Sequence, residues 1–202
     1  MSTVNVDAKQ IKALREKTNA GMMECRKALM ENGADMAKAE EWLKTRGLAK
    51  AEQKKDRVTA QGKVGCYLHM DGKGGAMVEL ASETDFVAQN EKFRELLKDL
   101  CLQVYATNPQ VLKREDIHAE QIAEGRKKFA EEVKGKPAEV AEKIVQGKLD
   151  KNFFSQRCLL EQAFVKDPSG KTLVKDMIAA RVSEFGENLS VRRFARFEVG
   201  QP

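Results

Sequence analysis

The stretch KVGCYLHMDGKGGAMVEL, residues 63–80, decides the fold class of this chain. Apolar residues occupy every second position on both sides of a glycine-rich turn at 71–75, which is the pattern of a β-hairpin. Each strand is therefore predicted to bury one of its two faces. The residues expected to face inward are Val64, Cys66, Leu68 and Met70 on the first strand and Ala76, Val78 and Leu80 on the second.

A long helix is predicted directly downstream, over residues 90–105. Asn90 is expected to open this helix, and Asn108-Pro109 to end it. Its apolar residues recur at the spacing of one helical face, and they are Phe93, Leu96, Leu97, Leu100, Cys101, Val104 and Tyr105. Because such a stripe is buried against another layer of structure, we expect this helix to pack across the sheet.

Three short helices are predicted upstream, in residues 1–48. Asp7 and Asp35 are suited to cap the first and third of them, a turn at 18–21 separates the first two, and Gly47 is expected to end the third. The residues expected in their core are Ile11, Leu14, Ala39, Trp42 and Leu43. A core this small is typical of a docking module rather than of a catalytic domain.

The rest of the chain is predicted to form a charged linker at 49–61 and a core domain at 62–202. Its further elements are predicted as helices at 116–134, 137–147 and 171–185, a strand or helix at 158–165, and a strand at 189–199. The residues that share one face of this last strand are Leu189, Val191, Arg193, Ala195, Phe197 and Val199. The predicted fold class is α+β: a three-helix N-terminal module followed by a small, mostly antiparallel sheet covered by helices.

Composition excludes several classes of protein. The chain has 202 residues, with 36 Lys and Arg against 31 Asp and Glu, and a formal net charge of +5. The charges alternate in sign along the predicted helices, so the pattern does not favour nucleic-acid binding. The four cysteines are scattered, which predicts reduced thiols and no zinc site. Since the sequence has neither a run of 18 apolar residues nor the pattern of a signal peptide, a cytoplasmic protein is expected.

The sequence predicts neither an enzyme nor a cofactor site. Residues 169–172, SGKT, resemble the end of a phosphate-binding loop, but the full motif needs a glycine where Val165 stands. His69 and His118 have no cysteine or serine at a recognisable nucleophile spacing, and the carboxylates lie on polar helix faces. We therefore expect no catalytic residue, no metal ion and no direct nucleotide binding.

Two adjacent methionines, Met22 and Met23, mark the first candidate interaction surface, together with Leu14, Arg15 and Gly21. The two methionines cannot both face the core of a short helix, so one is expected to be exposed. Methionine adapts well to a partner surface. The alternative is ordinary core packing with one incidentally exposed methionine.

The second candidate is the turn Thr84-Asp85-Phe86-Val87, between the hairpin and the long helix. Phe86 lies seven residues before Phe93, so it would join the core stripe if one helix ran through both. A break between Ala88 and Asn90 would instead leave Phe86 free to project outward. The residues alone leave these two alternatives open.

Two stretches of sequence stand out as motifs, LREKTNAGMMECRKAL at 14–29 and ETDFVA at 83–88. Both resemble signatures of the bacterial elongation factor Ts family. Residues 35–47, 161–167 and 192–198 are similar to further parts of the family, so the resemblance spans almost the whole chain. Asn19 and Ala163 depart from the glycine and proline that the family usually has there. The chain resembles the compact form of the family, without a coiled-coil insertion.

The resemblance implies guanine-nucleotide exchange on elongation factor Tu, a GTPase. It implies an N-terminal module similar to ubiquitin-associated domains that docks on the GTPase, and the docking residues would be Leu14, Arg15, Met22 and Met23. It further implies that Thr84, Asp85, Phe86 and Val87 form a wedge near the magnesium site of the GTPase. The partner would hold the nucleotide, so no cofactor is expected here.

A ribosome- or RNA-binding helical adaptor is the rival interpretation. Its candidate residues are Arg192, Arg193 and Arg196 with Phe194 and Phe197, and three of these share the polar face of the last predicted strand. A separate expectation concerns a second copy of the chain. An edge position in the sheet would let the last strand pair with that copy, as a homodimer or in a 2:2 complex.

Overall fold

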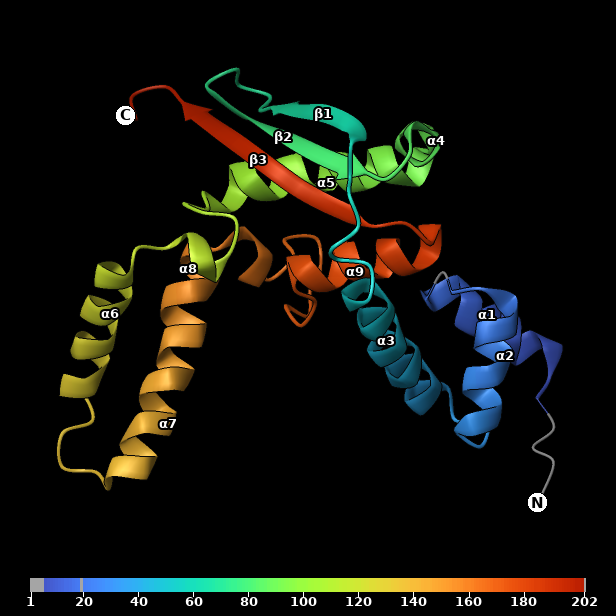
Figure 1. Cartoon of the computed structure of the whole chain (residues 1–202), viewed down its shortest axis with the longest axis horizontal. Coiled ribbons are helices and arrows are strands. Elements are labelled where there is room, and N and C mark those ends of the chain that lie inside the picture. Colours follow the sequence, from blue (N-terminus) through green and yellow to red (C-terminus); the bar gives the residue numbers. More distant parts are fainter. Residues whose placement is uncertain (1–5, 19, 202) are drawn as a thin grey trace. The chain divides into compact units, whose positions relative to one another are not determined.

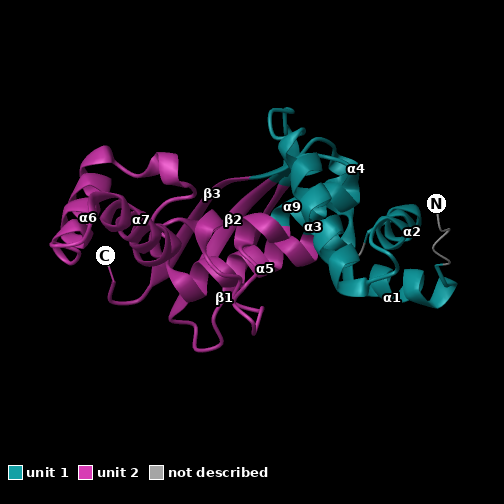
Figure 2. Cartoon of the chain, turned by 90° about the horizontal axis from the view of Figure 1, so that it is seen from below, with its two compact units in different colours: residues 1–62, 81–93, 178–190 teal, residues 63–80, 94–177, 191–202 magenta. Residues whose placement is uncertain are grey.

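The computed structural model describes residues 6–18 and 20–201, so Asn19 of the predicted turn lies outside the described residues. The chain forms two compact units, each assembled from separate stretches (Figure 2). Unit 1 comprises Met1–Gly62, Ala81–Phe93 and Ile178–Ser190, and unit 2 comprises Lys63–Leu80, Arg94–Met177 and Val191–Pro202. The division predicted from the sequence consists instead of three consecutive segments, the module at 1–48, the linker at 49–61 and the core domain at 62–202. That division stays a prediction.

Three helices form the N-terminal module of unit 1, as predicted: α1 (Ala8–Thr18), α2 (Met22–Glu31) and α3 (Met36–Glu52) (Figure 1). The side chains buried between them are Leu14, Cys25, Ala28, Leu29, Ala39 and Leu43, with Trp42 partly buried against them. The Asp35 carboxylate accepts hydrogen bonds from the backbone N–H groups of residues 37 and 38, which confirms it as the cap of α3.

The predicted end of the third helix at Gly47 is wrong, because α3 continues to Glu52. A glycine inside a helix costs ~1 kcal/mol relative to alanine, so such a position often serves close packing. A Cβ on Gly47 would lie 3.7 Å from Ser183 Cβ. The glycine therefore lies where α3 meets α9 (Val174–Phe185), and the first residues of the predicted linker are helical.

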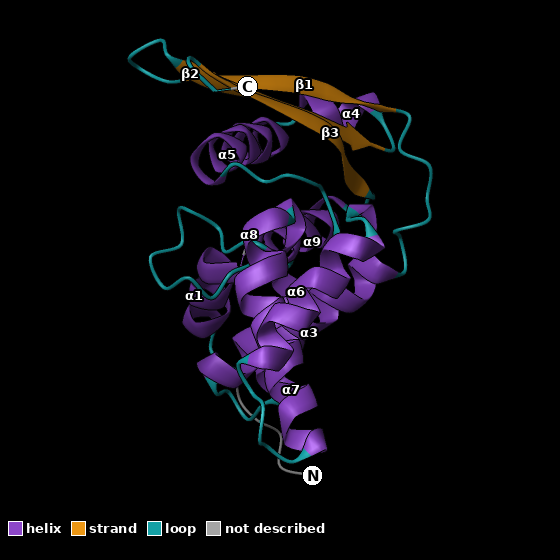
Figure 3. Cartoon of the chain, turned by 90° about the vertical axis from the view of Figure 1, so that its left-hand side faces the viewer, coloured by secondary structure: helices purple, strands orange, loops and turns teal. Residues whose placement is uncertain are grey.

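The strands β1 (Gln61–Leu68), β2 (Gly74–Ser82) and β3 (Leu189–Glu198) form an antiparallel sheet in the order β1-β2-β3. Helix α5 (Glu91–Thr107) runs along one side of this sheet (Figures 1 and 3). The predicted inward residues of β2 are buried, and so is the predicted stripe of α5 apart from Tyr105, which is half-buried. The α+β fold class is confirmed.

The predicted inward face of β1 is wrong, because that face points to solvent. Its four exposed residues are Val64, Cys66, Leu68 and Met70. The opposite face contacts α5: a Cβ on Gly65 would lie only 2.6 Å from Leu97 Cγ, and the ring centroids of Tyr67 and Tyr105 are 5.4 Å apart. Alternation shows which side chains share a face, but the missing side chain at Gly65 decides which face the helix can approach.

Strand β3 passes from buried to exposed surroundings along its length. Leu189 and Val191 are buried, whereas Phe197 on the same face is 70% exposed. On the opposite face, the Arg196 guanidinium lies over the ring of Tyr105 in α5, 5.4 Å from its centroid. The outward side of the sheet is therefore largely apolar. We call it the open sheet face. Its exposed apolar residues are Val64, Cys66, Leu68, Met77, Ala195 and Phe197, and the exposed Arg193 lies on the same face.

The remaining helices of unit 2 surround a second apolar core. They are η1 (Arg114–Asp116), α6 (Ala119–Glu131), α7 (Ala138–Leu149), the π-helical turn η2 (Asp150–Phe154), α8 (Ser155–Arg157) and η3 (Leu159–Glu161). Helices α6 and α7 lie side by side (Figure 1), and the core beneath them contains Ile117, Val133, Val145, Leu149, Phe153, Phe154 and Cys158. Instead of the strand considered for 158–165, Cys158 forms an isolated β-bridge with Val111.

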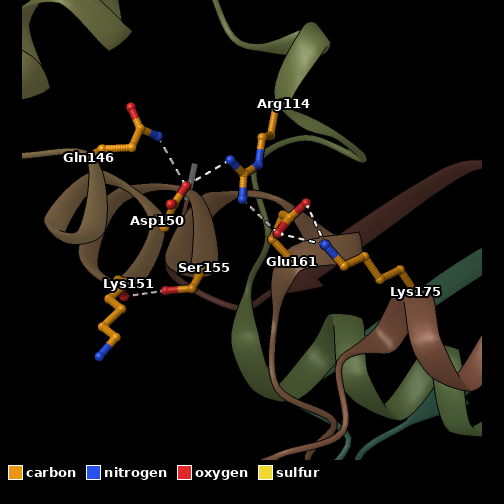
Figure 4. Close-up of polar contacts among 7 residues, drawn as sticks. All are labelled: Arg114, Gln146, Asp150, Lys151, Ser155, Glu161 and Lys175. Atoms are coloured by element: carbon orange, nitrogen blue, oxygen red, sulfur yellow. Dashed lines mark hydrogen bonds and ion pairs between the residues drawn. The ribbon is translucent and has the colours of Figure 1, made fainter. Parts of the chain in front are cut away.

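A network of charged side chains fastens these helices together (Figure 4). Arg114 donates to Asp150 Oδ1 at 2.7 Å and to Glu161 Oε2 at 2.9 Å, and its guanidinium lies over the ring of Phe154. Lys175 donates to the same Glu161 oxygen at 3.1 Å. Burial alone raises the pKa of Glu161, but the two cations outweigh it and hold that pKa below its ordinary value. The carboxylates of Asp150 and Glu161 are engaged in ion pairs that join η1, η2 and η3.

Candidate functional site

The turn predicted to act as a wedge forms a short helix of its own, α4 (Asp85–Gln89). Asn90 follows it in an extended conformation, with ψ of 141°, and α5 then begins as a separate helix. The Asn90 side chain accepts a hydrogen bond from the backbone N–H of Lys92 at 2.9 Å, as expected for a residue that opens a helix. The register between Phe86 and Phe93 is therefore interrupted.

Phe86 points away from the protein and is 82% exposed. The next two residues of α4, Val87 and Ala88, are buried and anchor the turn. Thr84 caps the helix, since its hydroxyl accepts a hydrogen bond from the Val87 N–H at 3.4 Å. The alternative that placed Phe86 in the core stripe is wrong, and Val87 supports the turn from below.

Residues of the connection between α9 and β3 hold this turn from the other side. Both oxygens of the Glu187 carboxylate accept from Thr84, one from its N–H at 3.1 Å and one from its hydroxyl at 2.8 Å. In return, Glu83 Oε1 accepts from the Asn188 N–H at 2.6 Å. Reasoning from the sequence missed Glu187 and Asn188, because 103 residues separate Thr84 from its partner and no local pattern connects them.

The predicted docking residues occupy two different environments. Leu14 is fully buried in the core of the N-terminal module, so its prediction as a direct contact residue is corrected: it can only support the surface from beneath. Arg15 is exposed, and Met22 and Met23 are 58% and 73% exposed. Both methionines are therefore accessible, whereas only one of them was expected to be exposed. The first buried side chain of α2 is that of Cys25.

The stretch that resembles a phosphate-binding loop is closed by its own carboxylate. Asp167 accepts hydrogen bonds from the backbone N–H of Ser169 at 2.9 Å and of Thr172 at 2.8 Å. Hydrogen bonds from these two residues hold the pKa of Asp167 well below its ordinary value. A phosphate would have to compete with this carboxylate for the same N–H groups.

Residues 6–18 and 20–201 contain no group of three or more His, Cys, Asp or Glu side chains that could hold a metal ion. His69, predicted to be a surface residue, is partly covered: its ring stacks on Tyr105 at 5.0 Å, and its Nδ1 lies 3.1 Å from the Tyr67 hydroxyl. Over the same described part of the chain, no helix combines the length and apolarity needed to cross a membrane.

Two of the three arginines proposed for RNA binding, Arg193 and Arg196, are engaged within unit 2. Arg196 donates to the Tyr105 carbonyl at 2.9 Å and to Glu198 at 2.6 Å, and Arg193 donates to Glu79 at 2.7 Å. The face that carries Arg196 was interpreted as an outward polar face, but this arginine packs against α5. Arg196 therefore does not lie on the outward polar face that the RNA-binding interpretation assigned to it.

Comparison with known proteins identifies a family. The family model described as "Elongation factor TS" matches residues 2–201. Elongation factor Ts of Thermodesulfovibrio yellowstonii is 51% identical over 197 residues, which cover 97% of this chain and 97% of that protein. The corresponding protein of Oleidesulfovibrio alaskensis is 46% identical over 96% of this chain and 98% of its own length. For that of Myxococcus xanthus, the identity is 46% over 97% of this chain and 89% of the relative. On these matches, the chain belongs to the elongation factor Ts family.

Proposed function

We propose that this chain is the guanine-nucleotide exchange factor of elongation factor Tu and acts in the cytoplasm. Family membership establishes the broader role of a translation elongation factor. The observation that carries the finer proposal is Phe86, an aromatic side chain that is 82% exposed on a turn anchored from two sides. Release of GDP from the partner breaks no covalent bond, so the role requires no catalytic group in this chain.

The turn at 84–87 has properties suited to disturbing a nucleotide site. Mg²⁺ demands near-ideal octahedral geometry, so a small displacement of the residues around it weakens its hold on the nucleotide phosphates. The exposed ring of Phe86 can wedge apart such residues, and the exposed carboxylate of Asp85 beside it brings negative charge toward an anionic nucleotide. Together, these two side chains would favour the nucleotide-free GTPase.

Thermodynamics sets the condition for this role. The factor speeds release only if it binds the nucleotide-free GTPase more tightly than the GDP-bound form. By reciprocity, GDP must weaken binding of the factor by the same ratio. In our proposal, Arg15, Met22 and Met23 of the N-terminal module bind the GTPase in both states, and the turn at 84–87 supplies the difference between them.

The proposal is tested by the release of a fluorescent GDP analogue from purified elongation factor Tu. Adding the chain should accelerate release, and excess GDP should dissociate the complex that forms. Unchanged release would overturn the proposal. If, in addition, the chain bound RNA with an affinity that falls steeply with salt, the RNA-binding adaptor would replace it.

We also propose that two copies of the chain associate through the open sheet face. Its exposed side chains are mostly apolar and stand on a sheet whose edge strands are β1 and β3. A hollow of about 700 Å³ is lined in part by three residues of this face, Leu68, Met77 and Phe197. A two-fold pair of such faces is self-complementary, which fits a homodimer or a 2:2 complex with the GTPase.

Sedimentation equilibrium tests this association. The wild-type chain should show a mass above that of the monomer at micromolar concentrations, and the Phe197→Glu variant should sediment as a monomer. A wild-type chain that stays monomeric at ~100 μM would overturn the proposed pairing, because its association free energy would then be weaker than ~5.5 kcal/mol.

A further inference from the structure

We propose that Glu187 is a positioning residue for nucleotide exchange. In this inference, which rests on the proposed exchange function, Glu187 aims Phe86 at the GTPase by holding Thr84. Glu187 acts through its two hydrogen bonds to Thr84, at 3.1 and 2.8 Å, and needs no contact with the partner.

The hydrogen bonds around Thr84 form a directed chain. A threonine hydroxyl has one proton to donate and two lone pairs to accept with. The proton of Thr84 is donated to Glu187, so the lone pairs are turned toward the Val87 N–H that the hydroxyl caps. A carboxylate is a stronger hydrogen-bond acceptor than a neutral group, so Glu187 determines the direction of the hydrogen bonds around Thr84. Without Glu187, the hydroxyl can rotate, and the cap of α4 loses its defined direction.

Helix α4 depends on such external anchors because it contains only five residues. A helix this short is not stable by itself in water. Its direction is determined by the cap at Thr84, the buried Val87 and Ala88, and the break at Asn90. Loss of the first anchor should therefore change the direction of Phe86 before it affects the fold of unit 1.

Asn188 provides the rigid base from which Glu187 acts. Its buried side-chain amide donates to the carbonyls of Lys55 at 3.1 Å and Arg57 at 2.9 Å. Its backbone N–H donates to Glu83, the residue directly before Thr84. The turn and the α9–β3 connection are thus joined in both directions, with the segment after α3 tied to the same point.

The experiment compares Glu187→Ala and Glu187→Gln with the wild-type chain in the release of fluorescent GDP from elongation factor Tu. For Glu187→Ala, the maximal release rate at saturating factor should fall at least ~10-fold. The half-saturating concentration should change less than ~3-fold, because the exposed docking residues are untouched. Glutamine keeps one acceptor oxygen, so its variant should retain an intermediate rate.

One matched control accompanies these variants. Glu52→Ala removes an exposed glutamate of unit 1 that pairs with Lys55, and it should leave the release rate unchanged. Thermal unfolding followed by circular dichroism shows whether each variant is folded, and Glu187→Gln takes the place of Glu187→Ala if the latter is not.

A double-mutant cycle separates positioning from a general structural role. If Glu187 acts through Phe86, then Glu187→Ala should cause no further loss in a Phe86→Ala background. An equal loss in both backgrounds, or a wild-type rate for Glu187→Ala, would overturn the inference while leaving the exchange function intact. Failure of the wild-type chain to accelerate release would instead overturn the proposed function itself.

Discussion

Replacing Phe86 by alanine tests the wedge directly. A phenylalanine buries ~200 Å² when it enters an interface. With 82% of that area still exposed in the free chain, ~160 Å² is left to bury, and at ~25 cal/mol per Å² this limits the contribution to ~4 kcal/mol. Aromatic anchors of this kind often lose ~2 kcal/mol or more on truncation. We therefore expect GDP release to slow by at least ~10-fold and by at most ~10³-fold.

The assay is stopped-flow release of a fluorescent GDP from elongation factor Tu at increasing concentrations of the factor. Because Phe86 packs against little of its own chain, the variant should unfold within ~0.5 kcal/mol of the wild type. Met70→Ala is a suitable control, since it removes a side chain that is 96% exposed and has no proposed role in contacting the GTPase. Its release rate should equal that of the wild type.

Two results would refute the reasoning. A Phe86→Ala variant that releases GDP at the wild-type rate would show that the exposed ring does not contribute to exchange. A variant that loses stability by several kcal/mol would show that the ring is packed in solution, contrary to its position here.

Three further predictions concern stability. Gly65→Ala should cost ~1–3 kcal/mol in urea unfolding, because the added Cβ would lie 2.6 Å from Leu97 Cγ. Burial raises the pKa of the Cys158 thiol to about 11, so the native thiol should resist a thiol reagent at pH 8. The unfolded thiol loses its proton at a lower pH than the folded one. The free energy of unfolding should therefore decrease as pH rises from ~9 to ~11, and alkaline unfolding measures this decrease. The pKa of Glu161 is lowered, so its ion pair with Arg114 stabilises the fold above the unfolded pKa of that carboxyl. This stability is lost as pH falls, and Glu161→Gln should flatten the acid limb of the stability profile.

Local features of the fold follow from the sequence because they depend on neighbouring residues. The apolar stripe of α5 and the Asp35 cap of α3 are set by spacings of three and four residues, and both are confirmed. The hairpin is also confirmed, since alternation and a glycine-rich turn specify it within 18 residues.

Features that depend on distant parts of the chain were mispredicted or left open. The covered face of β1 is decided by how closely α5 approaches Gly65, which alternation in the strand cannot reveal. Gly47 signals a helix end by composition, yet it serves close packing against Ser183, 136 residues later in the chain.

The candidate site likewise combines features that neighbouring residues determine with features that depend on distant residues. Both docking methionines and the Thr84–Val87 turn were predicted from motif and residue type, and their roles in binding stay predictions. The outward direction of Phe86 could not be decided from the sequence, because it depends on the break at Asn90 and on the distant Glu187. Leu14 was misassigned to a contact role, since a family signature contains supporting core residues as well as exposed ones.

The construction of α4 has a consequence for engineering. Val87 and Ala88 face the protein and Phe86 faces outward, so the side chain at position 86 can be changed without repacking the fold. A factor carrying a smaller or differently shaped residue there, matched by a complementary change in the GTPase, would discriminate against the natural partner by a steric mismatch. The five-residue helix thus offers a replaceable specificity element from which mutually exclusive factor–GTPase pairs can be built.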